Sequence, residues 1–293
     1  MSAVTYLING ISLGAVYAII ALGYTMVYGI AKMLNFAHGD VIMIGSYVIF
    51  SVVSMASLPV PVGILLSVIL CTVLGVTIEK IAYKPLRGAS SLAVLITAIG
   101  VSYFLQNIAL LIFGANTKAF SSVVSMEGFS LFNGRVNVSG ETIVTILCCI
   151  VIMIALTLFI NKTKAGQAML AVSEDKGAAQ LMGINVNGTI SLTFAIGSGL
   201  AAIAGMLLCS SYPALTPYTG SMPGIKAFVA AVFGGIGSIP GALIGGIILG
   251  VIEIMSKAYI SSQLSDAIVF MVLIIVLLVK PTGLLGKKIQ EKV

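Results

Sequence analysis

Long apolar runs alternate with short polar connections along almost the whole chain. A helix that crosses a lipid bilayer needs about 20 mainly apolar residues, so these runs are candidate membrane spans. They extend over Val4–Tyr28, Val41–Ser57, Pro61–Ile78, Leu92–Phe113, Thr142–Ile160, Thr189–Ser211, Ile225–Gly237, Gly241–Met255 and Ala267–Val279. The pattern predicts an all-α fold, namely a polytopic integral membrane protein with about 8–9 transmembrane helices, including short or broken segments.

The seventh and eighth runs are short and meet at the sequence GGIGSIPG, Gly234–Gly241. They are either two short spans or the two halves of one broken helix. Pro240 favours a break, because proline removes a backbone amide and clashes with the preceding turn of a helix. Broken helices in transporters often flank the substrate path. The segment is therefore a candidate pathway or gate, with Gly235, Gly237, Pro240 and Gly241 as its residues.

Small residues recur at every fourth position in two places. The first series is Gly197, Ala201 and Gly205, and the second is Gly237, Gly241 and Gly245. This spacing puts small residues on one face of a helix and lets backbones approach closely. We expect tight packing between helices of this chain, with a share in the contact to a second subunit as the alternative.

The composition excludes a soluble protein. Of the 293 residues, 59% are hydrophobic and only 8% are charged, whereas soluble domains carry about 25% charged residues. No phosphate-binding loop of the form GxxxxGK[ST] is present, so nucleotide hydrolysis is not expected in this chain. We expect residues 1–293 to form a single transmembrane domain. The net charge of +6 does not indicate nucleic-acid binding, because the basic residues sit beside the spans.

The basic residues also predict the orientation of the chain. Three regions carry most of them, and loops rich in lysine and arginine face the cytoplasm. The regions are 79–90 with Lys80, Lys84 and Arg87, 161–188 with Lys162, Lys164 and Lys176, and the tail 280–293 with Lys280, Lys287, Lys288 and Lys292. All three are expected to be cytoplasmic, with Lys32 on the same side and the N-terminus outside.

A polar segment, Ala171–Gly188, interrupts two spans that carry no charge. Ser173 is a possible N-cap, Glu174 and Asp175 suit a first helical turn, and Gly183 suits a helix C-terminus. These residues predict a short amphipathic helix on the cytoplasmic face. Two interpretations remain open on this pattern alone, an ordinary connecting helix or a coupling helix that docks in a groove of an ATPase.

Four motifs resemble one family. The segment EDKGAAQLMGI resembles the "EAA…G" loop of ABC-importer permeases, in the form EDxxAAxLMGI of the branched-chain amino acid family. Three further stretches are similar to the H-type permease of the high-affinity branched-chain amino acid ABC importer. They are GISLGAVYAIIALGYTMVYGI (Gly10–Ile30), LNFAHGDVIMIGSY (Leu34–Tyr47) and AFVAAVFGGIGSIPGALIGGIILGVIE (Ala227–Glu253).

This resemblance implies a permease that forms half of a translocation path for leucine, isoleucine and valine in a bacterial-type inner membrane. It implies a heterodimer with a homologous M-type permease, two cytoplasmic ATP-binding subunits and a periplasmic substrate-binding protein. ATP and Mg would be bound by those partners, with no cofactor in this chain. Residues 161–188 would be the coupling loop, and its ATPase-coupling residues would be Ser173, Glu174, Asp175, Ala178, Ala179, Leu181, Met182 and Gly183. Permeases for urea, short amides or other amino acids share the motifs and are the alternative.

The sequence LNFAHG (Leu34–Gly39) interrupts the apolar pattern between the first two spans. One interpretation is an unwound backbone beside the translocation path, with Asn35, His38 and Gly39 as candidate pathway residues. The other is a turn at the cytoplasmic end in which Asn35 caps the next helix and His38 is interfacial. We favour the turn, because Lys32 and Asp40 suggest proximity to water. His38 is the only histidine, so no histidine metal site is expected.

Acidic residues within the spans are scarce. Glu253 and Asp266 fall near span ends with Lys226 and Lys257 at similar depth, which indicates local ion pairing, with a contact to a binding protein as the alternative. An ion-coupled secondary transporter usually needs carboxylates at mid-membrane, and their scarcity argues against that rival. A structural or assembly protein is disfavoured by the polar segment. No nucleophile–base pair is apparent, so we expect a transport subunit and not an enzyme.

Overall fold

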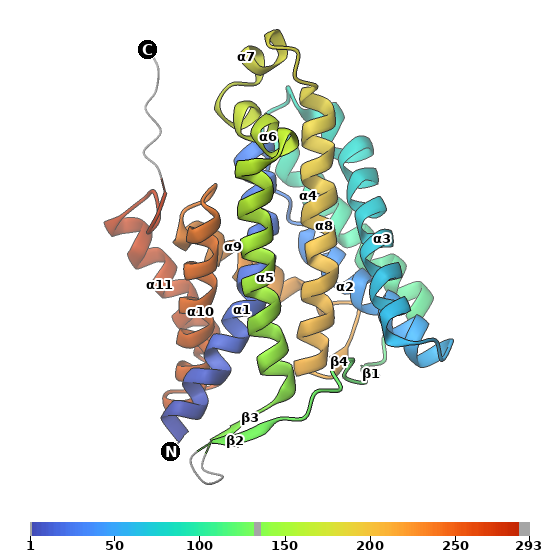
Figure 1. The fold of residues 1–293 in the computed structure, drawn as a ribbon, viewed down its shortest axis with the longest axis vertical. Coiled ribbons are helices and arrows are strands. Elements are labelled where there is room, and N and C mark those ends of the chain that lie inside the picture. The colour runs from blue at the N-terminus through green and yellow to red at the C-terminus, as the bar shows by residue number, and fades with distance from the viewer. Residues whose placement is uncertain (1, 132–135, 287–293) are drawn as a thin grey trace.

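The computed structural model describes residues 2–131 and 136–286, and helices make up most of them (Figure 1). The helices are α1 (Ser2–Ala31), α2 (His38–Phe50), α3 (Val60–Ile78), α4 (Ser91–Phe113), α5 (Gly140–Lys162), α6 (Lys164–Glu174), α7 (Lys176–Leu181), α8 (Val186–Ser211), α9 (Ser221–Gly234), α10 (Ile239–Tyr259) and α11 (Ser265–Val279). The π-helical segment η1 (Ser51–Met55) extends α2. The segments η2 (Glu79–Tyr83), also π-helical, and η3 (Lys84–Leu86), a 3₁₀ turn, extend α3.

Each expected span coincides with a helix. In the described part of the chain, seven helical segments are long and apolar enough to cross a membrane, while α9 and α11 are shorter. This confirms the all-α, polytopic membrane fold. Two further helices, α6 and α7, lie outside the spans, and the polar segment contains the end of α6 and all of α7.

Helix α1 is the centre of the bundle. In its membrane-spanning window 94% of the residues are buried, against 22% for α4 and for α5. Its sequence is apolar on every face between Ala15 and Leu22, and a helix of that kind is stable only when protein surrounds it or lipid covers it. Helices α5, α8, α9 and α10 pack around α1.

Glycines set the closest contacts between helices. A Cβ atom on Gly205 of α8 would lie 2.6 Å from the carbonyl oxygen of Ile42 in α2, and one on Gly245 of α10 would lie 2.2 Å from that of Ala230 in α9. The expected packing of small residues within this chain is therefore confirmed at these two positions. A third seam, which the sequence analysis missed, joins Gly14 of α1 to Gly250 of α10.

The two ends of the bundle differ in kind. The N-terminus and the hairpin of β2 (Phe129–Leu131) and β3 (Val136–Val138) lie at one end, and α6 and α7 lie at the other (Figure 1). Strand β1 (Lys118–Ala119) pairs with β4 (Ala214–Leu215) and ties the loop before α5 to the segment after α8. The loop 114–139 thus contains a two-stranded hairpin.

Candidate functional site

The connection between α1 and α2 turns back into the bundle instead of staying at its end. It leaves α1 at Lys32, whose φ of 59° is in the left-handed region. His38 then lies against Gly23, since a Cβ on Gly23 would be 2.5 Å from His38 Nε2. Gly23 precedes the end of α1 by eight residues, or about 12 Å of helix. The segment 32–37 is therefore re-entrant, and α2 begins inside the bundle.

This geometry corrects the interpretation that the sequence favoured. Asn35 does not cap α2, because the N-cap is Ala37 and makes no side-chain hydrogen bond. Asn35 is buried and its Oδ1 accepts a hydrogen bond of 2.9 Å from the Tyr83 hydroxyl. His38 is 1% exposed and packs edge-on against Tyr24, so it is not interfacial. Polar backbone at this depth is tolerated because protein surrounds it.

The Gly234–Gly241 segment is a tight turn between two antiparallel helices, and Pro240 is not its cause. Pro240 stands in the first turn of α10, where a missing amide costs nothing, and Ser238 caps that helix by accepting from the Gly241 amide. The reversal comes from Gly235 and Gly237, with φ of 105° and 92°. The expected break thus exists, but it separates the short helix α9 from a full-length span.

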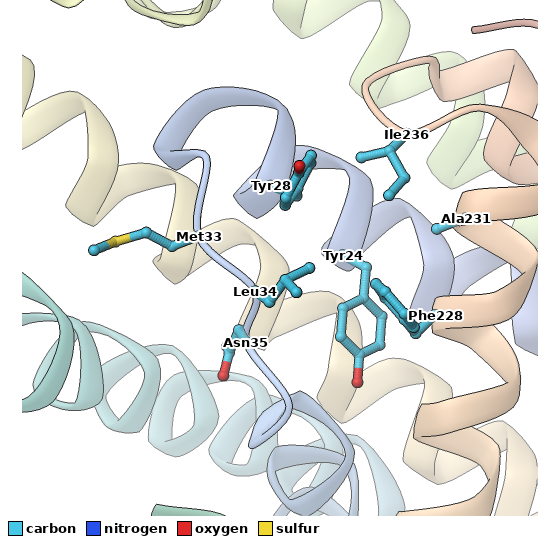
Figure 2. Close-up of a pocket in the computed structure, with 8 residues that line it drawn as sticks. All are labelled: Tyr24, Tyr28, Met33, Leu34, Asn35, Phe228, Ala231 and Ile236. Atoms are coloured by element: carbon cyan, nitrogen blue, oxygen red, sulfur yellow. The ribbon is translucent and has the colours of Figure 1, made fainter. Parts of the chain in front are cut away.

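The re-entrant segment and the α9–α10 turn meet across a narrow crevice (Figure 2). Figure 2 shows Tyr24, Leu34 and Phe228 grouped in it, with Ile236 of the turn above them. The remaining lining residues are Tyr28, Met33, Asn35 and Ala231. The crevice is too narrow to admit a water molecule. It is a closed, mainly apolar contact between two segments that the sequence analysis had proposed separately as gates.

The crevice includes few of the candidate gate residues. Asn35 lines it, whereas His38 and Gly39 lie deeper, beside α1 and α9. Gly235 and Gly241 are buried against other backbone, and Gly237 and Pro240 are exposed. The aromatic residues Tyr24, Tyr28 and Phe228 were missed. Their only sequence signal is the spacing of two tyrosines by four on the first span.

The polar segment contains the end of α6 and all of α7, which are separated by Asp175. The backbone of Asp175 is extended, and its side chain accepts a hydrogen bond of 3.0 Å from the Ala178 amide. Asp175 and not Ser173 is therefore the N-cap. Ser173 and Glu174 end α6, and the Ser173 hydroxyl donates to the Leu170 carbonyl.

Gly183 ends α7 as expected. Its φ is 82°, its amide donates to Gln180, and the amide of Ile184 donates to Ala179. These two bonds form a Schellman motif. The motif fixes Leu181 and Met182 at the tip of the molecule, where they are 90% and 82% exposed. Two large apolar side chains held in solvent by a rigid turn indicate a surface that another protein covers. Ala178 is exposed beside them and Ala179 is buried.

Lys176 joins this surface to the crevice. Its Nζ donates a hydrogen bond of 2.9 Å to the carbonyl of Ala31, the last residue of α1. Partial burial lowers the pKa of Lys176, and the nearby charges of Arg87 and Lys32 lower it further. The bond connects the start of α7 to the point where the re-entrant segment leaves α1.

Near the opposite end, Glu253 is the centre of a buried ion-pair cluster. Its carboxylate accepts from Lys226 at 2.8 Å, from Lys257 at 2.6 Å and from the Tyr17 hydroxyl at 2.8 Å. Lys226 also pairs with Asp266 at 2.7 Å. Glu253 is 1% exposed, so it has no surface to offer to a binding protein. The expected local ion pairing is confirmed.

Known proteins resemble the chain over nearly its full length. Residues 6–277 match the family described as "Branched-chain amino acid transport system / permease component". The high-affinity branched-chain amino acid transport system permease protein LivH of Salmonella typhimurium is 46% identical over 97% of this chain and 96% of its own length. The permease BraD of Pseudomonas aeruginosa, described in the same terms, is 45% identical over 98% and 97%. A probable permease LivH of Methanocaldococcus jannaschii is 32% identical over 92% and 88%.

Proposed function

The chain belongs to the family of permease components of branched-chain amino acid transport systems, and from this premise we propose that it forms half of the translocation path of an ATP-driven importer for leucine, isoleucine and valine. The match over residues 6–277 carries the proposal. It confirms the resemblance that the four motifs indicate. As a permease component, the multi-pass chain is a transport subunit and not an enzyme.

The proposed assembly contains a homologous M-type permease, two cytoplasmic ATP-binding subunits and a periplasmic substrate-binding protein. In it, residues 1–293 are one permease domain in a bacterial-type inner membrane, with 161–188 as the coupling loop. ATP and Mg bind to the partners. The loops 79–90 and 161–188 and the tail 280–293 face the cytoplasm. The exposed apolar tip at Leu181 and Met182 supports an ATPase contact there.

The geometry supports a mechanism for coupling. Closure of the two ATPases would displace α6 and α7. Through the bond from Lys176 to Ala31, that displacement reaches the end of α1 and the re-entrant segment. Movement of Leu34 and Asn35 away from Phe228 and Ile236 would open the crevice toward the cytoplasm. Its aromatic and aliphatic lining suits the passage of an aliphatic side chain.

The assembly is tested by purifying the tagged chain in mild detergent and identifying co-eluting proteins by mass spectrometry. We expect a second permease and ATP-binding subunits. Proteoliposomes of that complex, given the cognate binding protein, should accumulate leucine when ATP is supplied on the cytoplasmic side. Uptake of urea or a short amide in place of leucine would move the chain to the alternative substrates. Recovery of this chain alone, with uptake driven by an ion gradient, would refute the proposal.

Replacing Glu174 by lysine should weaken ATPase association several-fold, because it reverses an exposed charge beside the proposed contact. Glu174 is exposed at the end of α6, so the spans should fold normally. Co-purification measures the association, and Glu127→Lys, an exposed charge in the loop at the opposite end, is the matched control. Normal association and uptake in the Glu174 variant would contradict the coupling assignment.

Replacing Lys176 by methionine should lower leucine uptake per ATP hydrolysed by roughly tenfold, the lower end of the range expected for loss of one charged hydrogen bond. Methionine keeps most of the length of the lysine side chain, but it cannot donate a hydrogen bond to the Ala31 carbonyl. Lys176→Arg, which keeps a donor, should retain most of the uptake. Both rates are measured on the same proteoliposomes. Equal uptake-to-hydrolysis ratios for methionine and arginine would exclude this bond from the coupling route.

A further inference from the structure

Three carboxylates are buried in the described part of the chain, and two of them have cationic partners. Glu79 pairs with Arg87 and accepts from the Ser191 hydroxyl. Glu253 pairs with Lys226 and Lys257. Asp40 is 2% exposed, yet within residues 2–131 and 136–286 no lysine, arginine or histidine nitrogen pairs with it. It is the carboxylate that the sequence analysis had placed near water.

Asp40 lies midway across the bundle. The carbonyl of its neighbour Val41 faces the Sγ of Cys71 at 3.6 Å, and Cys71 is near the middle of the continuous helical segment Val60–Leu86. Helices α2 and α9 both begin at this depth. A Cβ on Gly39 would lie 2.5 Å from the Gly220 carbonyl oxygen and 3.4 Å from the Gly224 Cα. The two short helices thus start in backbone contact at mid-depth.

Among the described residues, the side chains around the Asp40 carboxylate that hydrogen-bond in this cluster are neutral. The Gln106 side-chain amide lies 2.9 Å from Asp40 Oδ1, and 3.2 Å from both the Ser102 and the Ser221 hydroxyl oxygens. An uncompensated carboxylate at the centre of a membrane protein is costly and commonly marks a site for substrate or ions. The contrast with Glu79 and Glu253 indicates that the cation for Asp40 is not one of the described residues of this chain.

The cluster is close to the surface formed by α4 and α9. Ser102 and Ser221 are half-buried, while their neighbours Tyr103 and Met222 are exposed. Gly100, Tyr103 and Asn107 share an exposed face of α4 with the aliphatic residues Ile96 and Leu111. If a second permease covered this surface of α4 and α9, a ligand moving between the two subunits would be separated from Asp40 by a single layer of side chains.

We propose that Asp40 binds the α-ammonium group of the amino acid during its passage, with Gln106 and Ser221 as its neutral neighbours. This inference rests on the proposed import of branched-chain amino acids. The Gln106 amide occupies Asp40 Oδ1 when no substrate is present and can turn to the Ser102 hydroxyl, which it already reaches. The ammonium group then satisfies the carboxylate, and the aliphatic side chain requires no polar partner.

The test is Asp40→Asn in the assembled importer, reconstituted with loaded binding protein. Asparagine keeps the size of the side chain and a hydrogen bond to Gln106 but removes the charge. We expect leucine uptake to fall about tenfold or more, as for removal of one member of a buried charged contact. ATPase stimulation by the loaded binding protein should persist. Asp40→Glu should keep part of the uptake, and Glu127→Gln, an exposed acid in the outer loop, should match the wild type.

Two outcomes would overturn the inference. Wild-type uptake by Asp40→Asn would show that Asp40 is a structural hydrogen-bonding group. If that variant does not assemble, the test uses the wild-type importer. Inhibition of leucine uptake is measured with two leucine analogues, chosen because they do not displace leucine from the binding protein. Leucinol, which keeps the ammonium group, should inhibit uptake, and 4-methylpentanoate should not; the reverse order would overturn the proposal. Absence of leucine uptake in the wild type would instead overturn the proposed function.

Discussion

Replacing Glu253 by glutamine should destabilise the chain by about 3–5 kcal/mol, the cost of removing one partner from a buried ion pair. The substitution keeps the shape of the side chain but leaves Lys226, which is 6% exposed, without its buried partner. Among the described residues, the acidic partner that Lys226 retains is Asp266, whose side chain is 42% exposed. The apparent melting temperature of the purified chain in detergent should fall by several degrees. Because the chain has no tryptophan, the assay follows a fluorescent tag during size exclusion.

A double variant separates the orphaned charge from the lost packing. Glu253→Gln combined with Lys226→Met removes both charges, so it should recover part of the stability that the single variant loses. Glu127→Gln applies the same change to an exposed side chain in the loop 114–139 and should leave the melting temperature unchanged. The explanation fails if the double variant is less stable than Glu253→Gln, since the cost would then come from packing around the cluster.

The spans could be predicted because an apolar run of sufficient length has one stable arrangement in a bilayer. The boundary between α6 and α7, inside the polar segment, could not be predicted from the sequence. Ser173 and Asp175 are both good N-cap residues. Burial of Met169 and Val172 holds the end of α6 against the bundle, so Ser173 stays inside that helix and Asp175 caps the next one. Local sequence offers both caps, and tertiary packing selects the second.

The depth at which the LNFAHG segment lies in the bundle could not be predicted, for a related reason. Lys32 is exposed and Asp40 is buried, although only eight positions separate them. Local polarity indicates that a segment avoids lipid, but it does not distinguish water from the interior of a protein. Placing Asn35 beside Tyr83 and His38 beside Gly23 depends on contacts between distant parts of the chain. Asp40 is itself a carboxylate buried within the bundle, so such carboxylates are less scarce than the sequence indicates.

Replacing Gly250 by alanine should impair transport severely, because it adds a methyl group between the backbones of α10 and α1. A Cβ at this position would lie 2.2 Å from the Gly14 amide nitrogen and 2.6 Å from the Gly10 carbonyl oxygen. Backbone atoms cannot rotate away as a side chain does, so α10 and α1 must separate. Overpacking of this kind costs about 1–3 kcal/mol, against a gain of about 1 kcal/mol from replacing glycine in a helix.

Gly100→Ala is the matched control, because Gly100 is also within a helix but has nothing within 4 Å of its Cβ position. It should raise the melting temperature slightly, whereas Gly250→Ala should lower it. The loss of uptake should be larger than the lowered stability alone would cause. Helix α1 carries Tyr24 and Tyr28 into the crevice and ends at Ala31, whose carbonyl accepts from Lys176. A shift of α1 displaces both the lining of the crevice and the carbonyl to which Lys176 donates, which are the proposed gate and its proposed link to α7. Wild-type uptake in Gly250→Ala would show that transport tolerates a displaced α1, and would remove α1 from the proposed coupling route.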